Sequence, residues 1–168
     1  LRSPKYGTIL RDLGLTHRIP PFEHVDDLAE CDPDAPRRAD YKAGDVVNRR
    51  KLDRLWTLIC QSRVPIVVGL GGVGKTTIGL AIAHRWTSER AAGAYYFDVK
   101  LAPEMGSNVT QEILEALDMY EGTQELFVID NVHLLRRESL SRLMDTAQSE
   151  DSPPVLLLAR RFDSNLLQ

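Results

Sequence analysis

A glycine-rich run that ends in lysine and threonine is the part of this sequence with the clearest chemistry. It reads Gly69-Leu70-Gly71-Gly72-Val73-Gly74-Lys75-Thr76 and fits the spacing G-x-x-x-x-G-K-[ST]. Glycines let a backbone take positive φ angles and bring successive N–H groups around one phosphate, and a following helix adds its positive N-terminal dipole. In such a loop Lys75 reaches the outer phosphates, Thr76 holds Mg²⁺ and Thr77 lies near the innermost phosphate. The run therefore predicts a phosphate-binding loop.

A phosphate loop of this kind requires an acidic residue at a neighbouring strand end to fix the magnesium shell. The apolar run 126–129 ends in Asp130, where a buried strand meets the crevice outside the strand ends. One β-α-β interval separates Asp130 from the loop, and this spacing favours a magnesium ligand over a turn residue. Two further acids at or near strand ends, Asp98 and Glu125, are interpreted as ordinary solvated carboxylates.

Strand-like apolar runs alternate with helical patterns from Asp45 onward, which is typical of βα units on a largely parallel sheet. The apolar spacing predicts helices over 49–61, 75–87, 109–120 and 137–147. It predicts strands over 65–69, 94–99, 126–130 and 155–159. Near-continuous aliphatic strands, the one at 65–69 included, indicate an α/β sheet that is covered on both faces.

The first 44 residues differ from the rest in their proline content and in the shortness of their apolar runs. They contain Pro20-Pro21 and the run 32–38, in which Asx-Pro steps interrupt any regular element. We expect an irregular N-terminal segment and connector over 1–44, with one short helix around Thr8 to Leu13. The core domain is then predicted over 45–168.

Composition narrows the classes of protein. The 168 residues include 43% hydrophobic and 27% charged residues, which indicates one globular domain with an appendage. A net charge of −3 makes a nucleic-acid partner unexpected for this piece. Cys31 and Cys60 are too few for a disulfide scaffold, and the longest apolar run, 64–70, is too short to span a membrane. We therefore expect no membrane contact and a cytoplasmic location.

Three segments resemble those of the STAND NTPases, the signal transduction ATPases with numerous domains, which include the NB-ARC proteins. Residues 67–78 are similar to their Walker A motif, and Phe127-Val128-Ile129-Asp130-Asn131-Val132-His133 resembles their Walker B segment. The run 46–52 is similar to the linker that borders adenine. The resemblance implies a three-layer P-loop NTPase core with a parallel sheet, of the additional-strand (ASCE) division shared with AAA+ proteins. It also implies ATP or ADP with Mg²⁺ as ligands, held at the base by Val47 and Arg49.

The same resemblance assigns catalytic roles. Besides Lys75 and Asp130, the strand 155–159 would carry an arginine sensor and lie between the Walker A and Walker B strands. Arg160 and Arg161 fall on opposite faces of that strand, and we assign Arg161 to the γ-phosphate. Many hydrolysing relatives carry Glu after the Walker B Asp, whereas this chain has Asn131, which cannot accept a proton. Either His133, whose neutral imidazole can accept one, orients the water, or hydrolysis is slow.

Together these features lead us to expect an ATP-binding, slowly hydrolysing switch within a larger signalling or defence protein, with nucleotide-dependent self-assembly as an added expectation. A fifth core strand is expected beyond residue 168. Two alternatives stay open at this point. One is an AAA+ ATPase acting on DNA, and the other is a nucleotide-stabilised structural module without turnover.

Overall fold

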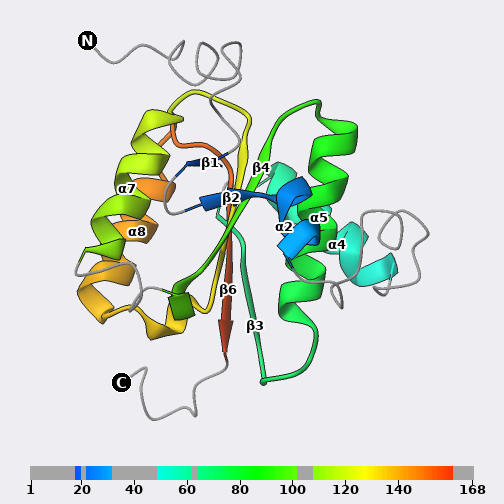
Figure 1. Ribbon diagram of the computed structural model, residues 1–168, viewed down its shortest axis with the longest axis horizontal. Helices are drawn as coiled ribbons and strands as arrows, with labels where there is room; N and C mark the ends of the chain where they lie inside the picture. The colour runs from blue at the N-terminus through cyan, green and yellow to red at the C-terminus, as the bar shows by residue number, and fades with distance from the viewer. Residues whose placement is uncertain (1–17, 20–21, 32–48, 62–63, 102–107, 161–168) are drawn as a thin grey trace.

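The computed structural model describes residues 18–19, 22–31, 49–61, 64–101 and 108–160 (Figure 1). Its strands form one mixed sheet in the order β1-β2-β4-β5-β6-β3. The strands are β1 (Arg18–Ile19), β2 (Phe22–His24), β3 (Ile66–Gly69), β4 (Ala94–Asp98), β5 (Leu126–Asp130) and β6 (Val155–Arg160). β4, β5, β6 and β3 run parallel, while β1 and β2 are antiparallel to their neighbours. The predicted α/β class with a mostly parallel sheet is confirmed, and β6 lies between β3 and β5 as the resemblance implied.

Helices lie on both sides of the sheet. Figure 1 shows α7 (Val109–Met119) and α8 (Arg137–Ala147) on one side, with α2 (Val25–Cys31), α4 (Arg49–Gln61) and α5 (Lys75–Glu89) on the other. Short 3-10 turns follow two of the strands, η1 (Val99–Leu101) after β4 and η2 (Val132–Leu134) after β5. None of the helices in the described part of the chain is long and apolar enough to cross a membrane.

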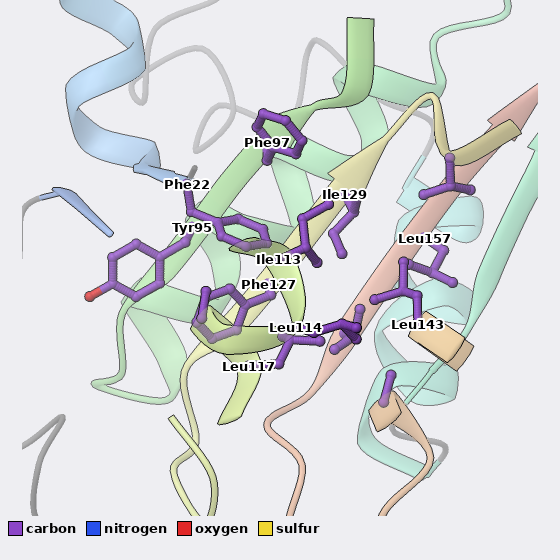
Figure 2. Close-up of a cluster of buried hydrophobic side chains, with 14 of the residues drawn as sticks. Phe22, Tyr95, Phe97, Ile113, Leu114, Leu117, Phe127, Ile129, Leu143 and Leu157 are labelled. Carbon is purple, nitrogen blue, oxygen red and sulfur yellow. The ribbon is translucent and has the colours of Figure 1, made fainter. Parts of the chain in front are cut away.

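The core consists of two hydrophobic clusters, one on each face of the sheet. Successive strand side chains point to opposite faces, so Phe127 and Ile129 of β5 join the cluster under α7 and α8, which Figure 2 shows. Leu126 and Val128 of the same strand join the cluster under α5. β5 is therefore buried along its whole length, as its near-continuous aliphatic sequence predicted.

The prediction that 65–69 forms a buried strand is wrong for β3. Ile66 is 42% exposed and Val68 is 58% exposed, while Val67 between them packs against the α5 cluster. Among the described residues β3 pairs with β6 alone, so it forms an edge of the sheet and has one face open. A continuous aliphatic run therefore does not require burial on both faces, because in the described part of the chain β3 is covered on one face only.

The expected irregular character does not hold for residues 18–19 and 22–31. β2 pairs with β4, where Glu23 lies opposite Tyr96, and Phe22 is completely buried. The Phe22 ring lies 4.8 Å from the ring of Phe127 in an edge-on contact. Pairing with the edge of β4 and this aromatic contact stabilise regular structure in residues 22–24, and the local sequence does not signal either interaction. The short helix predicted at 8–13 lies outside the described residues, and the boundary at 44/45 stays a prediction.

Gly79 brings α5 close to the sheet. A Cβ atom added at this glycine would meet Leu158 Cδ1 at 2.7 Å and Val128 Cγ1 at 3.3 Å. The first distance is shorter than any ordinary carbon contact, so a side chain at residue 79 would have to displace the end of Leu158. The first turns of α5, which begin at Lys75, therefore lie directly on β5 and β6.

Candidate functional site

The loop between β3 and α5 has the backbone conformation that its glycines permit. Gly72 has φ +74° and Gly74 has φ +80°, a left-handed conformation that strains residues with a Cβ. Gly74 is the N-cap of α5, and its carbonyl accepts the first helical hydrogen bond from the N–H of Ile78 at 3.0 Å. The N–H groups of the first helical turn have no partner within the helix. Loop and helix thus present backbone donors at one end of the sheet.

The loop and the start of α5 border a pocket of about 440 Å³ at the carboxyl ends of the parallel strands. Four chain segments line the pocket: the loop with the start of α5, the end of β4 with η1, the end of β5 with η2, and the end of β6. The lining residues are Gly71, Gly72, Gly74, Lys75, Thr76, Thr77, Tyr96, Asp98, Lys100, Asp130, Asn131, His133 and Arg160. Three of them are cations and two are carboxylates, a set that suits a polyphosphate accompanied by a divalent metal ion.

Asp130 lines this pocket and accepts several hydrogen bonds. Its side chain is 2% exposed, and Oδ2 accepts hydrogen bonds from Thr76 Oγ1 at 2.5 Å and from the Tyr96 hydroxyl at 3.1 Å. Oδ1 accepts the backbone N–H of Asn131 at 2.6 Å. Burial, followed by the charges of Asp130 and Asp98, raises the pKa of Tyr96 and keeps its hydroxyl a donor.

The oxygens of Thr76 and Asp130 fit a magnesium ion. Mg²⁺ usually keeps several water ligands and takes one or two protein oxygens together with substrate phosphates. The Thr76 hydroxyl can supply one protein oxygen, and the Asp130 carboxylate beside it can accept hydrogen bonds from the waters of the ion. The described residues hold no group of three or more His, Cys, Asp or Glu that would form a site without phosphate.

Asp98 is not the ordinary solvated acid that the sequence suggested. It lines the pocket, is the register partner of Asp130 on the neighbouring strand, and accepts the Asn131 side-chain amide at 2.8 Å. Asn131 itself has φ +57°, a left-handed conformation that asparagine tolerates better than most residues. Glu125 is also not solvated, because it is 4% exposed at the opposite end of β5.

His133 connects the turn after β5 to the end of β6 by a hydrogen bond. Its Nδ1 atom accepts the backbone N–H of Arg160 at 3.1 Å. A neutral imidazole that accepts at Nδ1 carries its proton on Nε2, so that nitrogen is a donor. Burial, then the charges of Arg160 and Lys75, lowers the pKa of His133, with Asp130 opposing and Lys100 adding to the shift. This arrangement gives neutral His133 a donor where we expected a proton acceptor.

The remaining predicted residues are placed in different ways. Leu70 and Val73 shape the loop but are exposed and do not line the pocket, and Lys75 Nζ donates to the Leu70 carbonyl at 2.7 Å. Gly69 ends β3, and Arg49 is exposed at the start of α4 without lining the pocket. Val47 and Arg161 lie outside the described residues. Arg160, the arginine that we did not choose, does line the pocket.

Sequence reasoning missed the contribution of β4. Tyr96 and Asp98 are two residues apart and share a face of that strand, and Lys100 follows in η1. Alternation along the predicted strand, combined with its place beside the Asp130 strand, was the signal that could have found the first two.

Lowering the pH should reduce the free energy of unfolding, and His133 should account for part of this loss. Because its pKa is lowered in the folded state, the unfolded chain takes up the proton first, and stability present above the ordinary pKa of about 6.5 is lost as the pH falls below it. Protonation also removes the acceptor for Arg160. We expect urea unfolding to show a smaller loss of unfolding free energy from pH 7 to pH 5 in His133→Asn, whose amide oxygen can replace Nδ1. An equal loss in both proteins would contradict this role.

The sheet order, the glycine loop and the flanking helices define a mixed α/β domain with a mostly parallel sheet. No family model and no curated protein matches the sequence. Among solved structures, C. elegans PCH-2 is similar at 13% identity and a TM-score of 0.54, over 87% of this chain and 46% of that chain. The E. coli MS115-1 HORMA:CdnC:Trip13 complex is similar at 15% identity and a TM-score of 0.55, over 74% and 60%. This chain thus spans about half to three fifths of those proteins, and the similarity shows the fold.

Proposed function

We propose that this chain is a nucleotide-binding domain that takes ATP with Mg²⁺, hydrolyses it slowly and acts as a switch in a larger protein. The observation that carries the proposal is the contact between Thr76 and Asp130. It joins the first turn of α5, behind a left-handed glycine loop, to the acidic end of β5, a parallel strand separated from the loop strand by β6. A strand-to-helix turn that contained lysine by coincidence would not require this pairing.

In this proposal each of the four segments that line the pocket contributes groups that bind the nucleotide or the metal ion. The loop N–H groups and Lys75 would bind the phosphates, and Thr76 and Asp130 would hold the metal ion and its waters. Magnesium, when bound, supplies positive charge that offsets the charge on the outer phosphates. Lys100 and Arg160 place two further cations on the walls formed by η1 and β6. Nucleotide chemistry therefore uses the charges on all four segments.

The finer assignment to a STAND-type switch rests on the sequence resemblance of the loop and of the Asp130 segment. The solved neighbour that contains HORMA and CdnC is a protein assembly. By analogy with it we propose that this chain also works in a protein assembly, with nucleotide-dependent self-association as one form. A net charge of −3 gives no support to a DNA-directed role for this piece.

A module that binds nucleotide without turning it over is the second candidate. It is favoured by Asn131, because this amide stands where a catalytic glutamate is common and cannot take a proton. The two candidates differ only in whether bound ATP is consumed.

Calorimetry and single-turnover hydrolysis of radiolabelled ATP test the proposal. We expect saturable ATP binding that tightens with Mg²⁺, and turnover far below the enzyme median of about 10 s⁻¹. Absence of ATP binding would remove the function altogether. Rapid turnover by the isolated chain would contradict the switch and favour a motor or a phosphotransferase.

A further inference from the structure

We propose that Asp98 is a catalytic residue that orients the attacking water and accepts its proton, and that Asn131 is the positioning residue that holds Asp98 in place. This inference rests on the proposed function and names the group that performs its chemical step. It replaces the expected water-activating residue after Asp130 with a carboxylate on the neighbouring strand.

The position of Asp98 in the sheet brings it to the reaction site. It ends β4, lies opposite Asp130 in the register of the parallel pair, and lines the same pocket as Lys75 and Thr76. The carboxyl ends of β4 and β5 therefore present two acids side by side. Asp130 already accepts a hydrogen bond from Thr76, and we assign the activation of water to Asp98.

The hydrogen bonds that described residues donate to the Asp98 side chain fall on one of its two oxygens. The Asn131 amide donates to Oδ1 at 2.8 Å, and the backbone N–H of Lys100 donates to the same atom at 2.9 Å. An ionised carboxylate has about four acceptor sites on two oxygens. Within the described residues no hydrogen bond reaches Oδ2, so this oxygen can accept from a water molecule, while the two donors on Oδ1 fix the plane of the group.

The other groups around the pocket are less suited to accept a proton. Asp130 accepts three hydrogen bonds within the described chain, from Thr76, Tyr96 and the Asn131 backbone. His133 uses Nδ1 to accept the Arg160 N–H, which leaves its neutral ring a donor. Asn131 donates rather than accepts, and its donation goes to Asp98. Asn131, which cannot itself accept a proton, thus orients the Asp98 carboxylate, which can.

The step balances as an ordinary hydrolysis of ATP. The water oxygen forms a bond to the γ-phosphorus, and the bond from that phosphorus to the β–γ bridging oxygen breaks, with its electron pair remaining on ADP. One water proton passes to Asp98 Oδ2 and is later released to solvent, and inorganic phosphate leaves. β4 lies one strand further from the loop strand β3 than β5 does. We therefore expect a slow reaction even with this base in place.

The central experiment compares Asp98→Asn with the wild-type chain. The amide is isosteric and keeps an oxygen for Asn131 and Lys100, but it cannot accept a proton. We expect single-turnover hydrolysis to fall about 100-fold, the lower end of general-base contributions, while calorimetric ATP·Mg²⁺ affinity changes less than about threefold, well within the roughly tenfold that one lost hydrogen bond can cost. Asp145→Asn, on an exposed position of α8, is the matched control and should leave both quantities unchanged.

Asn131→Gly tests the positioning role separately. Glycine keeps the left-handed backbone at residue 131 and removes the side chain that holds Asp98, so the rate should fall about tenfold with unchanged ATP affinity. Wild-type hydrolysis that Asp98→Asn does not slow would overturn the proposal. ATP binding without any wild-type hydrolysis would also overturn it but would leave nucleotide binding intact. Failure of the wild-type chain to bind ATP would instead remove the proposed function.

Discussion

Lys75→Ala should weaken ATP binding by about 10- to 150-fold. The ammonium group lies in the pocket beside the glycine loop, where its Nζ donates to the Leu70 carbonyl at 2.7 Å. A charge-assisted hydrogen bond to phosphate contributes about 1.5 to 3 kcal/mol, and this energy converts to the stated change in affinity. The variant also removes the hydrogen bond to Leu70, so the expected loss includes the contribution of this loop contact.

The control for this measurement is Lys51→Ala, which removes an exposed lysine on α4 that does not line the pocket. Both variants change the net charge equally, so a general electrostatic effect would appear in both. Calorimetry should separate them, with Lys51→Ala close to the wild-type affinity. Equal ATP affinity in wild type and Lys75→Ala would show that the loop is not the phosphate site.

Asp130→Asn should remove most of the benefit that magnesium gives to ATP binding. Groups that act on a metal through its bound waters typically change metal affinity about 10- to 100-fold when replaced, and we expect a loss of that size in the presence of Mg²⁺. Binding measured in EDTA should stay nearly intact, because Lys75 and the loop N–H groups do not depend on the carboxylate. The amide oxygen can still accept from Thr76 or Tyr96, so the fold should be retained.

The same pair of titrations on Asp145→Asn provides the matched control, and thermal unfolding verifies that each variant is folded. The decisive quantity is the ratio of affinities with and without Mg²⁺. If Asp130→Asn changed both affinities by the same factor, Asp130 would not act through the metal.

Local patterns predicted the elements that carry the loop and its acid. The helix 49–61 was predicted at its observed bounds, since its apolar residues recur at helical spacing. The strand that ends at Asp130 was predicted equally well, because an unbroken aliphatic run ends there in a charge. The order of β3, β6 and β5 came from the family resemblance and agrees with the structure.

Features that depend on contacts between distant segments could not be predicted in this way. The pairing of Phe22–His24 with β4 depends on an open strand edge and a ring contact with Phe127, about a hundred residues along the chain. The bond from Asn131 to Asp98 joins residues of neighbouring strands, and nothing in either local sequence signals the other. The exposure of β3 depends on its place at the edge of the described sheet, which its aliphatic composition does not reveal.

The glycine at position 79 has a consequence for the geometry of the site. It lets the axis of α5 rest against Leu158 of β6 and Val128 of β5, and the same helix carries Thr76 at its start. Asp130 is two residues beyond Val128 on β5. The distance between the Thr76 hydroxyl and the Asp130 carboxylate therefore depends on packing in the hydrophobic core, where Leu158 and Val128 lie between the helix and the sheet.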